Sequence, residues 1–473
     1  MKEWLITNKI YILFLAFALI KGVIWILIIP PFLFPDEPAH FAYTQYIVEE
    51  KNLPKNDGKL SPHLLSKSEE LEEAINLIKN DYKIWSMDPI NLKIGESPNI
   101  PENFPSYSRK VNAENYKNAA AVYPPLYYAF EAIPYVIGYN LDIFHRVYLM
   151  RFFSLIFLLI TLIFAHKIAF FISNDKVFSF TVAAVISLIP ALNIISFGTI
   201  NNDAALIALG QIMFYYLIRL LHSRNITAKE IIKGGALLGA VLLTKTQAVF
   251  FVPLTMGVFI YNGVKYGKLP HKLTGLIILF LTAGIAALPF FAPPILAYFS
   301  GSSEEIFYSL RNENFKMEQN ALILLANDIV RRMAVFNTFW AEFLHTFASF
   351  RLYGEIAAGL LSVFALLGLT FAFVKFKGKE LNHWLLFCLL SILPLEFLYT
   401  LLYFKNALIN NYYQFPGQGR YYYILITPII ILFVFGLQNF FSLLKIPPRF
   451  IYAGLLFLFL LFHNLAFINL APY

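Results

Sequence analysis

Long apolar runs constrain this chain more than any other feature of its sequence. The runs are roughly 18–24 residues long, enough to cross about 30 Å of hydrocarbon as helices. Hydrophobic residues make up 58% and charged residues only 14% of the 473 residues, whereas soluble proteins average about 25% charged residues. We therefore predict an all-α fold, a polytopic transmembrane bundle of about eleven spans. The expected spans lie near residues 10–30, 148–170, 177–196, 202–221, 231–244, 247–262, 273–296, 354–374, 382–402, 421–439 and 450–469.

Basic residues are distributed between these spans in a way that predicts the orientation of the chain. The first run is too long for a signal-peptide core and is read as a retained span. If the N-terminus is cytoplasmic, nearly every short basic loop falls on the cytoplasmic side, as the positive-inside rule requires. The net charge of +8 therefore does not require a nucleic-acid partner. The inside cations are Lys167, Lys176, Arg219, Arg224, Lys229, Lys233, Lys265, Lys268, Lys272, Lys375, Lys377, Lys379, Lys445 and Arg449.

The extracytoplasmic side is expected to carry two long segments, residues 31–147 and 297–353. Both mix polar stretches with apolar and aromatic ones, some at helical spacing, which favours short helices at the membrane surface. Neither has the size or turn-residue content of a separate soluble domain. The single Cys388 lies in an apolar run, which excludes disulfides. We predict one multispan membrane domain, residues 1–473, with an elaborated outer face.

An acidic motif, Pro35–Phe41, follows the first span. Its prolines end the first helix and suit the start of the next one. Asp36 and Glu37 are costly at a membrane boundary unless they are hydrated, paired or used. The structural alternative is one capping acid with a solvated neighbour, which accounts for neither Glu37 nor His40. We predict a functional site at Asp36, Glu37 and His40.

Two cations lie in short outer loops, where Lys and Arg are disfavoured. They are Lys245 and Arg420, and binding of a phosphate would account for both of them. The alternative is that a long basic side chain extends from a helix end to the membrane interface. This is the preferred interpretation for Arg146 and Arg151. Lys21, in the middle of the first span, has no assigned partner.

Two Glu-x-x-His patterns raise the question of a metal. They are Glu37 with His40 and Glu342 with His345, both expected outside. Paired motifs of this kind on helices can hold two metal ions, but such short patterns are common by chance. A single divalent ion held at Asp36, Glu37 and His40 is favoured over a di-metal centre. The sequence establishes no cofactor with certainty.

The order of the motifs resembles that of the GT-C glycosyltransferases, which use polyprenyl- or dolichyl-phosphate sugars. Relatives include protein mannosyltransferases and aminoarabinose transferases of lipid A. The acidic pair follows the first span, a Pro-Pro-Leu-Tyr-Tyr corner precedes the second, and a Leu-Thr-Lys turn lies mid-chain. A closer resemblance is to the prokaryotic multispan family DUF2142, on Pro35–Phe41 and Gln418–Tyr421. We find no large soluble C-terminal domain, which departs from the oligosaccharyltransferases.

The resemblance implies an inverting transferase that moves a sugar from a polyprenyl-phosphate donor to a glycan, lipid or protein acceptor outside the membrane. Asp36 would take the proton of the acceptor hydroxyl, with Glu37 and His40 orienting the reactants. General-base catalysis of this kind increases the reaction rate roughly 10²–10⁴-fold. Lys245 and Arg420 would stabilise the charge on the departing lipid phosphate. The cavity wall would include Tyr123, Tyr127 and Tyr128.

A transporter or flippase of a lipid-linked or anionic solute is the main alternative, because buried charges and broken helices suit it too. The candidate residues, however, gather at one membrane boundary rather than at the midplane, and no repeat is evident. A noncatalytic assembly subunit is the third possibility. The polar residues at 35–41 favour the transferase over both.

Overall fold

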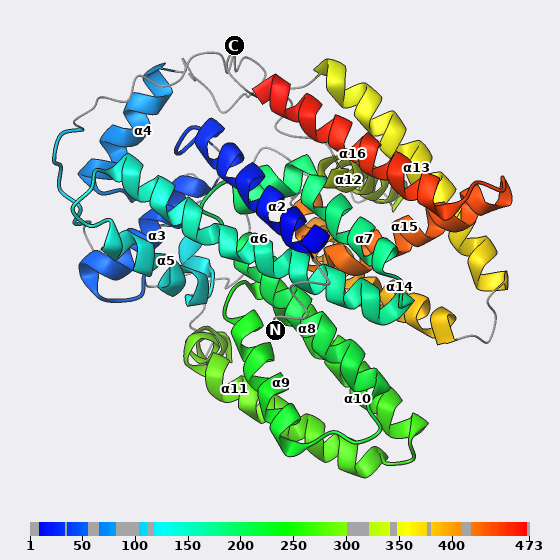
Figure 1. Cartoon of the computed structure of the whole chain (residues 1–473). Coiled ribbons are helices and arrows are strands. Elements are labelled where there is room, and N and C mark those ends of the chain that lie inside the picture. The colour runs from blue at the N-terminus through cyan, green and yellow to red at the C-terminus, as the bar shows by residue number, and fades with distance from the viewer. Residues whose placement is uncertain are drawn as a thin grey trace.

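The computed structural model describes residues 9–33, 36–54, 66–81, 104–111, 118–299, 321–340, 348–375, 380–408 and 418–470. Every regular element within these ranges is a helix (Figure 1), which confirms the predicted all-α fold. In chain order they are α2 (Lys9–Ile28), α3 (Glu37–Glu50), α4 (Glu69–Asp81), η3 (Ala119–Val122), α5 (Leu126–Ile137), α6 (Ile143–Ser173), α7 (Lys176–Leu188), the π-helix η4 (Leu192–Phe197), α8 (Asp203–His222), α9 (Ala228–Leu242), η5 (Thr246–Phe250), α10 (Phe251–Lys265), α11 (Leu269–Phe299), α12 (Ala321–Trp340), α13 (Ala348–Lys375), α14 (Glu380–Leu408), η6 (Gly419–Leu425), α15 (Ile426–Leu443) and α16 (Pro448–Leu470).

Nine helices in the described ranges are long and apolar enough to cross a membrane. Two of the eleven expected spans, near 177–196 and 231–244, correspond to helices too short to be counted among these nine, because α7 has 13 residues and α9 has 15. The chain leaves the α-helix after Leu188 and continues as the π-helix η4. The multispan character is thus confirmed, with two of the expected spans present as short helices.

Helix α6 passes through the middle of the molecule and packs against α2, α5, α7 and α8 (Figure 1). Helices α9, α10 and α11 project below it in this view, and α13 pairs with α15. The α13–α15 contact is backbone to backbone, since a Cβ on Gly368 would collide with the carbonyl oxygen of Gly436. Small residues at a crossing allow helices in a membrane to approach closely.

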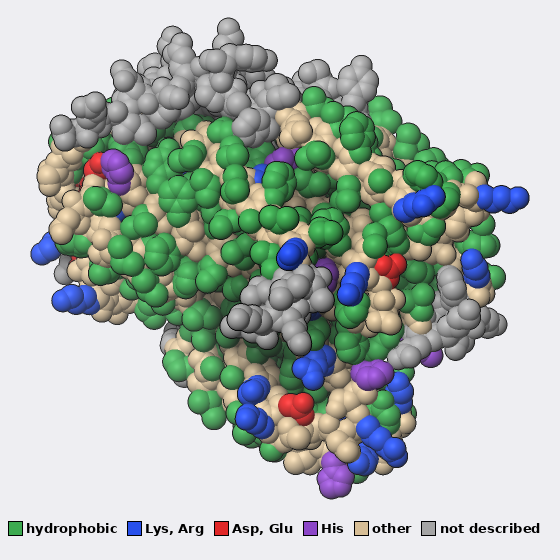
Figure 2. All heavy atoms as spheres, viewed as in Figure 1, with side chains coloured by type: hydrophobic (Ala, Val, Ile, Leu, Met, Phe, Trp, Pro, Cys, Tyr) green, Lys and Arg blue, Asp and Glu red, His purple; other side chains and the backbone are tan. Residues whose placement is uncertain are grey.

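Apolar side chains cover much of the molecular face drawn in Figure 2, while Lys, Arg and His gather at its lower end over α9, α10 and α11. Large hydrophobic residues on the spans are strongly exposed, among them Ile10, Ile285 and Phe457 at 75%, 78% and 70%. A contiguous apolar surface of this kind is unfavourable in water and suits a bilayer.

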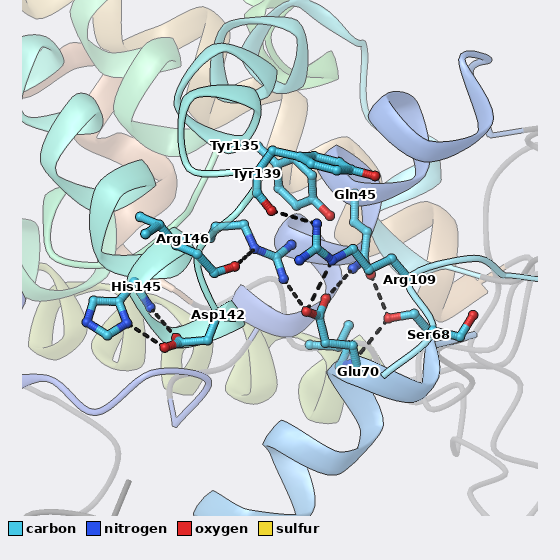
Figure 3. Close-up of polar contacts among 12 residues, drawn as sticks. Gln45, Ser68, Glu70, Arg109, Tyr135, Tyr139, Asp142, His145 and Arg146 are labelled. Carbon is cyan, nitrogen blue, oxygen red and sulfur yellow. Dashed lines mark hydrogen bonds and ion pairs between the residues drawn. The ribbon is translucent and has the colours of Figure 1, made fainter. Parts of the chain in front are cut away.

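A polar cluster around Glu70 ties the segment after α2 to the start of α6 (Figure 3). The carboxylate of Glu70 pairs with the fully buried Arg146 and, at 3.3 Å, with Nε of Arg109. Gln45 of α3 donates to Glu70 at 3.1 Å and accepts a hydrogen bond from Ser68 at 2.8 Å. The interpretation of Arg146 as a cation that reaches the interface is therefore wrong. Instead, it holds α4 and α3 against α6.

Candidate functional site

Four charged side chains from separate elements form a chain of ion pairs. Nη2 of Arg420 lies 2.8 Å from Oδ2 of Asp36, and its Nε lies 3.8 Å from Oδ2 of Asp203. Nζ of Lys245 lies 2.6 Å from Oδ1 of Asp203. The structure thus brings together Asp36, Lys245 and Arg420, although Asp36 and Arg420 are 384 positions apart in the sequence.

Asp36 stands at the N-cap position of α3 in a left-handed conformation, with φ 70° and ψ −21°. Residues with a Cβ rarely adopt positive φ. The side chain makes no capping hydrogen bond and reaches Arg420 instead, while remaining 47% exposed. Burial opposes its ionisation, but nearby positive charge, above all that of Arg420, outweighs this and holds the pKa of the carboxyl below its usual 3.8. Asp36 is an accessible carboxylate rather than a helix cap.

Arg420 is positioned by the glycine that precedes it. The backbone N–H of Gly419 donates to Oγ1 of Thr338 at 2.6 Å. A Cβ at Gly419 would collide with the backbone of Phe339 in α12. The Tyr423 hydroxyl, one turn further along η6, donates to the Phe339 carbonyl at 2.8 Å. The Gly-Arg pair of the C-terminal motif is therefore explained: only glycine lets η6 approach α12 closely enough to aim the guanidinium at Asp36.

Lys245 lies in the turn between α9 and η5 and is almost fully buried. Its ammonium lies 5.1 Å from the ring centre of Tyr123 and 5.8 Å from that of Tyr421, distances at which a cation is attracted to an aromatic face. Burial alone would lower its pKa, but the Asp203 carboxylate outweighs burial and raises it. Lys245 is thus a fixed positive charge.

Asp203 is the charged residue of the site that sequence reasoning missed. It is buried, at 1% exposure, and begins α8. Its backbone N–H is held by Oδ1 of Asn201 at 2.9 Å, and Asn202 donates to the Thr244 carbonyl at 3.3 Å. The available signal was the run of three polar residues, 201–203, at the head of an apolar span. Asp203 lies between the two cations, and its negative charge offsets the electrostatic repulsion between them.

Glu37 is fully buried and points away from this chain of ion pairs. Arg151 donates to both carboxylate oxygens, at 2.8 and 2.7 Å. The backbone N–H groups of Phe32 and Ile200 each donate to it at 2.9 Å. The interpretation of Arg151 as an interface cation is therefore wrong. Glu37 links α3 to α6 and to the loop before α8. It is therefore a positioning residue.

His40 lies behind Asp36, one helical turn into α3. Its Nδ1 is 2.8 Å from the Tyr128 hydroxyl, and its ring is nearly parallel to those of Tyr123 and Tyr128, with ring centres 6.0 and 5.8 Å away. Burial lowers its pKa to about 4, so the ring is neutral at pH 7. The Tyr127 and Tyr128 side chains have no exposed surface. They therefore support the site from within the protein, whereas the Tyr123 ring contacts Lys245.

The expected metal position does not fit this geometry. Both oxygens of Glu37 are used by Arg151, and Nδ1 of His40 faces Tyr128. Across the described ranges, no three His, Cys, Asp or Glu side chains come together as a ligand set. The second expected pair, Glu342 and His345, lies outside the described residues.

The fold and this site define a multispan helical membrane protein with a paired-charge site where several helices begin. The chain belongs to the family described as "Predicted membrane protein (DUF2142)", which matches residues 19–433. The match includes both the acidic motif and Arg420. A comparison with the curated proteins finds no match.

Two solved structures are similar in fold. One is ArnT from Cupriavidus metallidurans bound to undecaprenyl phosphate, at 10% identity and a TM-score of 0.45, over 95% of this chain and 62% of that one. The other is the Archaeoglobus fulgidus oligosaccharyltransferase tethered with an acceptor peptide, at 12% identity and a TM-score of 0.47, over 99% of this chain and 56% of that one. This chain therefore spans less than two thirds of the length of either.

Proposed function

We propose that this protein is an inverting membrane glycosyltransferase. Its donor would be a sugar linked to a polyprenyl phosphate, and its acceptor a cell-surface glycan, lipid or protein on the extracytoplasmic face. The observation that carries the proposal is the half-exposed Asp36 carboxylate, held 2.8 Å from Arg420 in one chain of ion pairs with Lys245. The order of the sequence motifs, which resembles that of the GT-C glycosyltransferases, gives the donor class.

The charges of the site suit a phosphodiester. Arg420 offers a planar fork of donors that matches phosphate oxygens, and Lys245 adds a second fixed charge. Within the described residues these two cations face two carboxylates, Asp36 and Asp203. A donor phosphate that takes up Arg420 would displace Asp36 from its ion pair. Asp36 would then lose its main source of positive charge, its pKa would rise, and it would become a stronger base.

The reaction is then a single displacement. The acceptor oxygen forms a bond to the anomeric carbon as the bond from that carbon to the phosphate oxygen breaks. The acceptor proton passes to Asp36, and the bonding electron pair leaves with the lipid phosphate. Arg420 and Lys245 stabilise the additional negative charge on that phosphate, a kind of stabilisation that is often the largest single contribution to catalysis.

The test of the base is transfer of a labelled sugar from a synthetic polyprenyl-phosphate donor by the purified protein. Asp36→Asn should reduce transfer by roughly 10²–10⁴-fold, while the protein remains monodisperse. Glu73→Gln, which removes an exposed acid from α4, is the matched control and should leave transfer unchanged. Full transfer by Asp36→Asn would show that this carboxylate is not the base.

Donor binding tests the cations separately. Arg420→Lys keeps the charge but loses the fork, so donor affinity should fall by about tenfold or more. Arg219→Lys, an exposed position at the other end of α8, is the matched control. Unchanged donor affinity in Arg420→Lys and in Lys245→Gln would remove the phosphate assignment.

A further inference from the structure

A polar cavity lies at the opposite end of α8 from the candidate site. It has a volume of about 370 Å³, and its polar lining comes from Arg224, Asn225, Lys268, His271 and Lys272. Helix α8 begins at Asp203 and has 20 residues, so at 1.5 Å per residue its two ends are about 30 Å apart. The cavity is therefore separate from the site around Asp36 and lies near the other membrane boundary.

The chain builds this cavity from two tight connections. After α8, Asn262 of α10 donates to the carbonyls of Leu220 and Ser223, at 2.7 and 2.9 Å, and fixes the turn that carries Arg224. After α10, Gly267 adopts a positive φ of 65°, a conformation that favours glycine. This lets the Lys268 backbone N–H return to the Gly263 carbonyl at 2.9 Å, so that Lys268 and the start of α11 face the cavity.

The charge on the cavity wall is not balanced by acids. No lining residue is acidic, and within the described residues Nζ of Lys268 hydrogen-bonds to the neutral side chain of Asn225, at 3.0 Å. Lys272 is 6% exposed, yet its ammonium has no hydrogen-bond or ion-pair partner in the described part of the chain. The nearby Glu230 is engaged in the capping box of α9 with Thr227.

The first turn of α11 adds to the positive electrostatic potential in the cavity. It contains no acidic residue, and the N-terminal N–H groups of a helix carry partial positive charge that favours anions. The positive-inside rule predicts basic residues in any cytoplasmic loop, but it requires neither a cavity nor a buried, unpaired lysine. The cations and the apolar lining residues Ile231 and Phe259 together suit a compact anion attached to, or next to, apolar groups.

We propose that this cavity binds a phosphate group, with Arg224, Lys268 and Lys272 as its cationic ligands. Basic pockets between transmembrane helices commonly receive anionic lipid headgroups. Free phosphate offers the same chemistry without the acyl chains. The site is independent of the proposed transferase reaction.

The experiment measures binding of three probes to the purified full-length protein in detergent. The probes are dioctanoyl phosphatidic acid, dioctanoyl phosphatidylcholine and inorganic phosphate. Lys268→Gln/Lys272→Gln removes two charges from the cavity. The matched control, Lys229→Gln/Lys233→Gln, removes two exposed charges from the same end of the molecule on α9. Arg224→Gln, at an exposed loop position, tests the cavity without touching a buried side chain.

Saturable binding of phosphatidic acid or inorganic phosphate, but not of phosphatidylcholine, is expected. The double cavity variant should weaken it by about tenfold or more and Arg224→Gln by about threefold, while the control pair changes it little. Tighter binding of phosphatidic acid would identify a lipid headgroup as the source, and equal binding of inorganic phosphate a soluble ligand. Equal loss in the cavity and control pairs would overturn the site, as would the absence of saturable binding.

Discussion

The Glu37–Arg151 pair is buried without exposed surface on either side chain, and its removal tests whether Glu37 positions the site or takes part in the chemistry. Breaking a buried pair by neutralising one partner costs about 3–5 kcal/mol. Glu37→Gln should therefore lower the thermal unfolding midpoint strongly, and transfer activity should fall with the amount of folded protein. Thermal unfolding in detergent and transfer per folded molecule are the two measurements.

The double variant Glu37→Gln/Arg151→Gln provides the control for that pair, because it leaves no buried charge without a partner. It should recover part of the stability lost in Glu37→Gln. A catalytic role would instead appear as lost transfer at unchanged stability, with no recovery in the double variant.

The lowered pKa of the buried His40 ring leads to a prediction of how the stability of the protein depends on pH. Burial lowers its pKa in the folded protein to about 4, against 6.5 as its ordinary value. Below pH 6.5 the unfolded chain binds a proton that the folded protein does not, so stability falls as the pH drops from 6.5 to 4. At 1.36 kcal/mol per pKa unit the loss reaches about 3 kcal/mol. His40→Gln should flatten the unfolding free energy over this window, measured as unfolding midpoint against pH. An unchanged pH profile in this variant would contradict the assignment.

Single residues show where sequence reasoning succeeded. Lys245 and Arg420 could be singled out because cations in loops predicted to face outward require a reason, and the structure pairs Lys245 with Asp203 and Arg420 with Asp36. Asp203 could not be distinguished, because an acid at the start of a helix is also favourable for local reasons. The partner of Glu37 was equally hidden, since Arg151 is 114 positions away.

At the scale of elements, the α13–α15 crossing is set by two glycines. A Cβ on Gly368 would meet the carbonyl oxygen of Gly436, and one on Gly436 would meet that of Ala365. Gly368→Val should force these helices apart and lower the unfolding midpoint by several degrees, because backbone cannot yield as a side-chain tip does. Gly359→Ala, on the same helix with nothing within 4 Å of its added Cβ, should be neutral. Equal midpoints in the two variants would show that the crossing is not tight.

The break after α7 shows what hydropathy cannot predict about an element. The apolar run near 177–196 reads as one span, but the helix ends at Leu188 and resumes as η4. Lys21, for which the sequence offered no partner, donates to the carbonyl of Ser187 at this break. Asn193 donates to the same carbonyl at 2.8 Å. A backbone group freed inside a membrane must find a donor, and only the folded arrangement shows that a lysine on α2 supplies it.

At the scale of the whole molecule, the apolar runs determined the class of fold because their length matches the bilayer and because a helix pairs most backbone groups within itself. How many of these helices cross fully depends on where each run leaves helical geometry. In the described residues nine of the eleven expected spans are long helices, while the other two are the short helices α7 and α9. Convergence of Asp36 and Arg420 required tertiary packing that no local pattern encodes.

The distribution of basic loops also predicts which way the molecule faces, and the cysteine content makes this directly measurable. Cys388 is the single cysteine and has no exposed surface, so the unmodified chain should react little with a membrane-impermeant maleimide. Glu73→Cys on α4 and Lys229→Cys on α9 place one thiol at each end, both at exposed positions. With the N-terminus cytoplasmic, Glu73→Cys should be labelled in intact cells and Lys229→Cys only after permeabilisation, as read by gel shift. The reverse pattern would place the candidate site, and with it the proposed chemistry, on the cytoplasmic face.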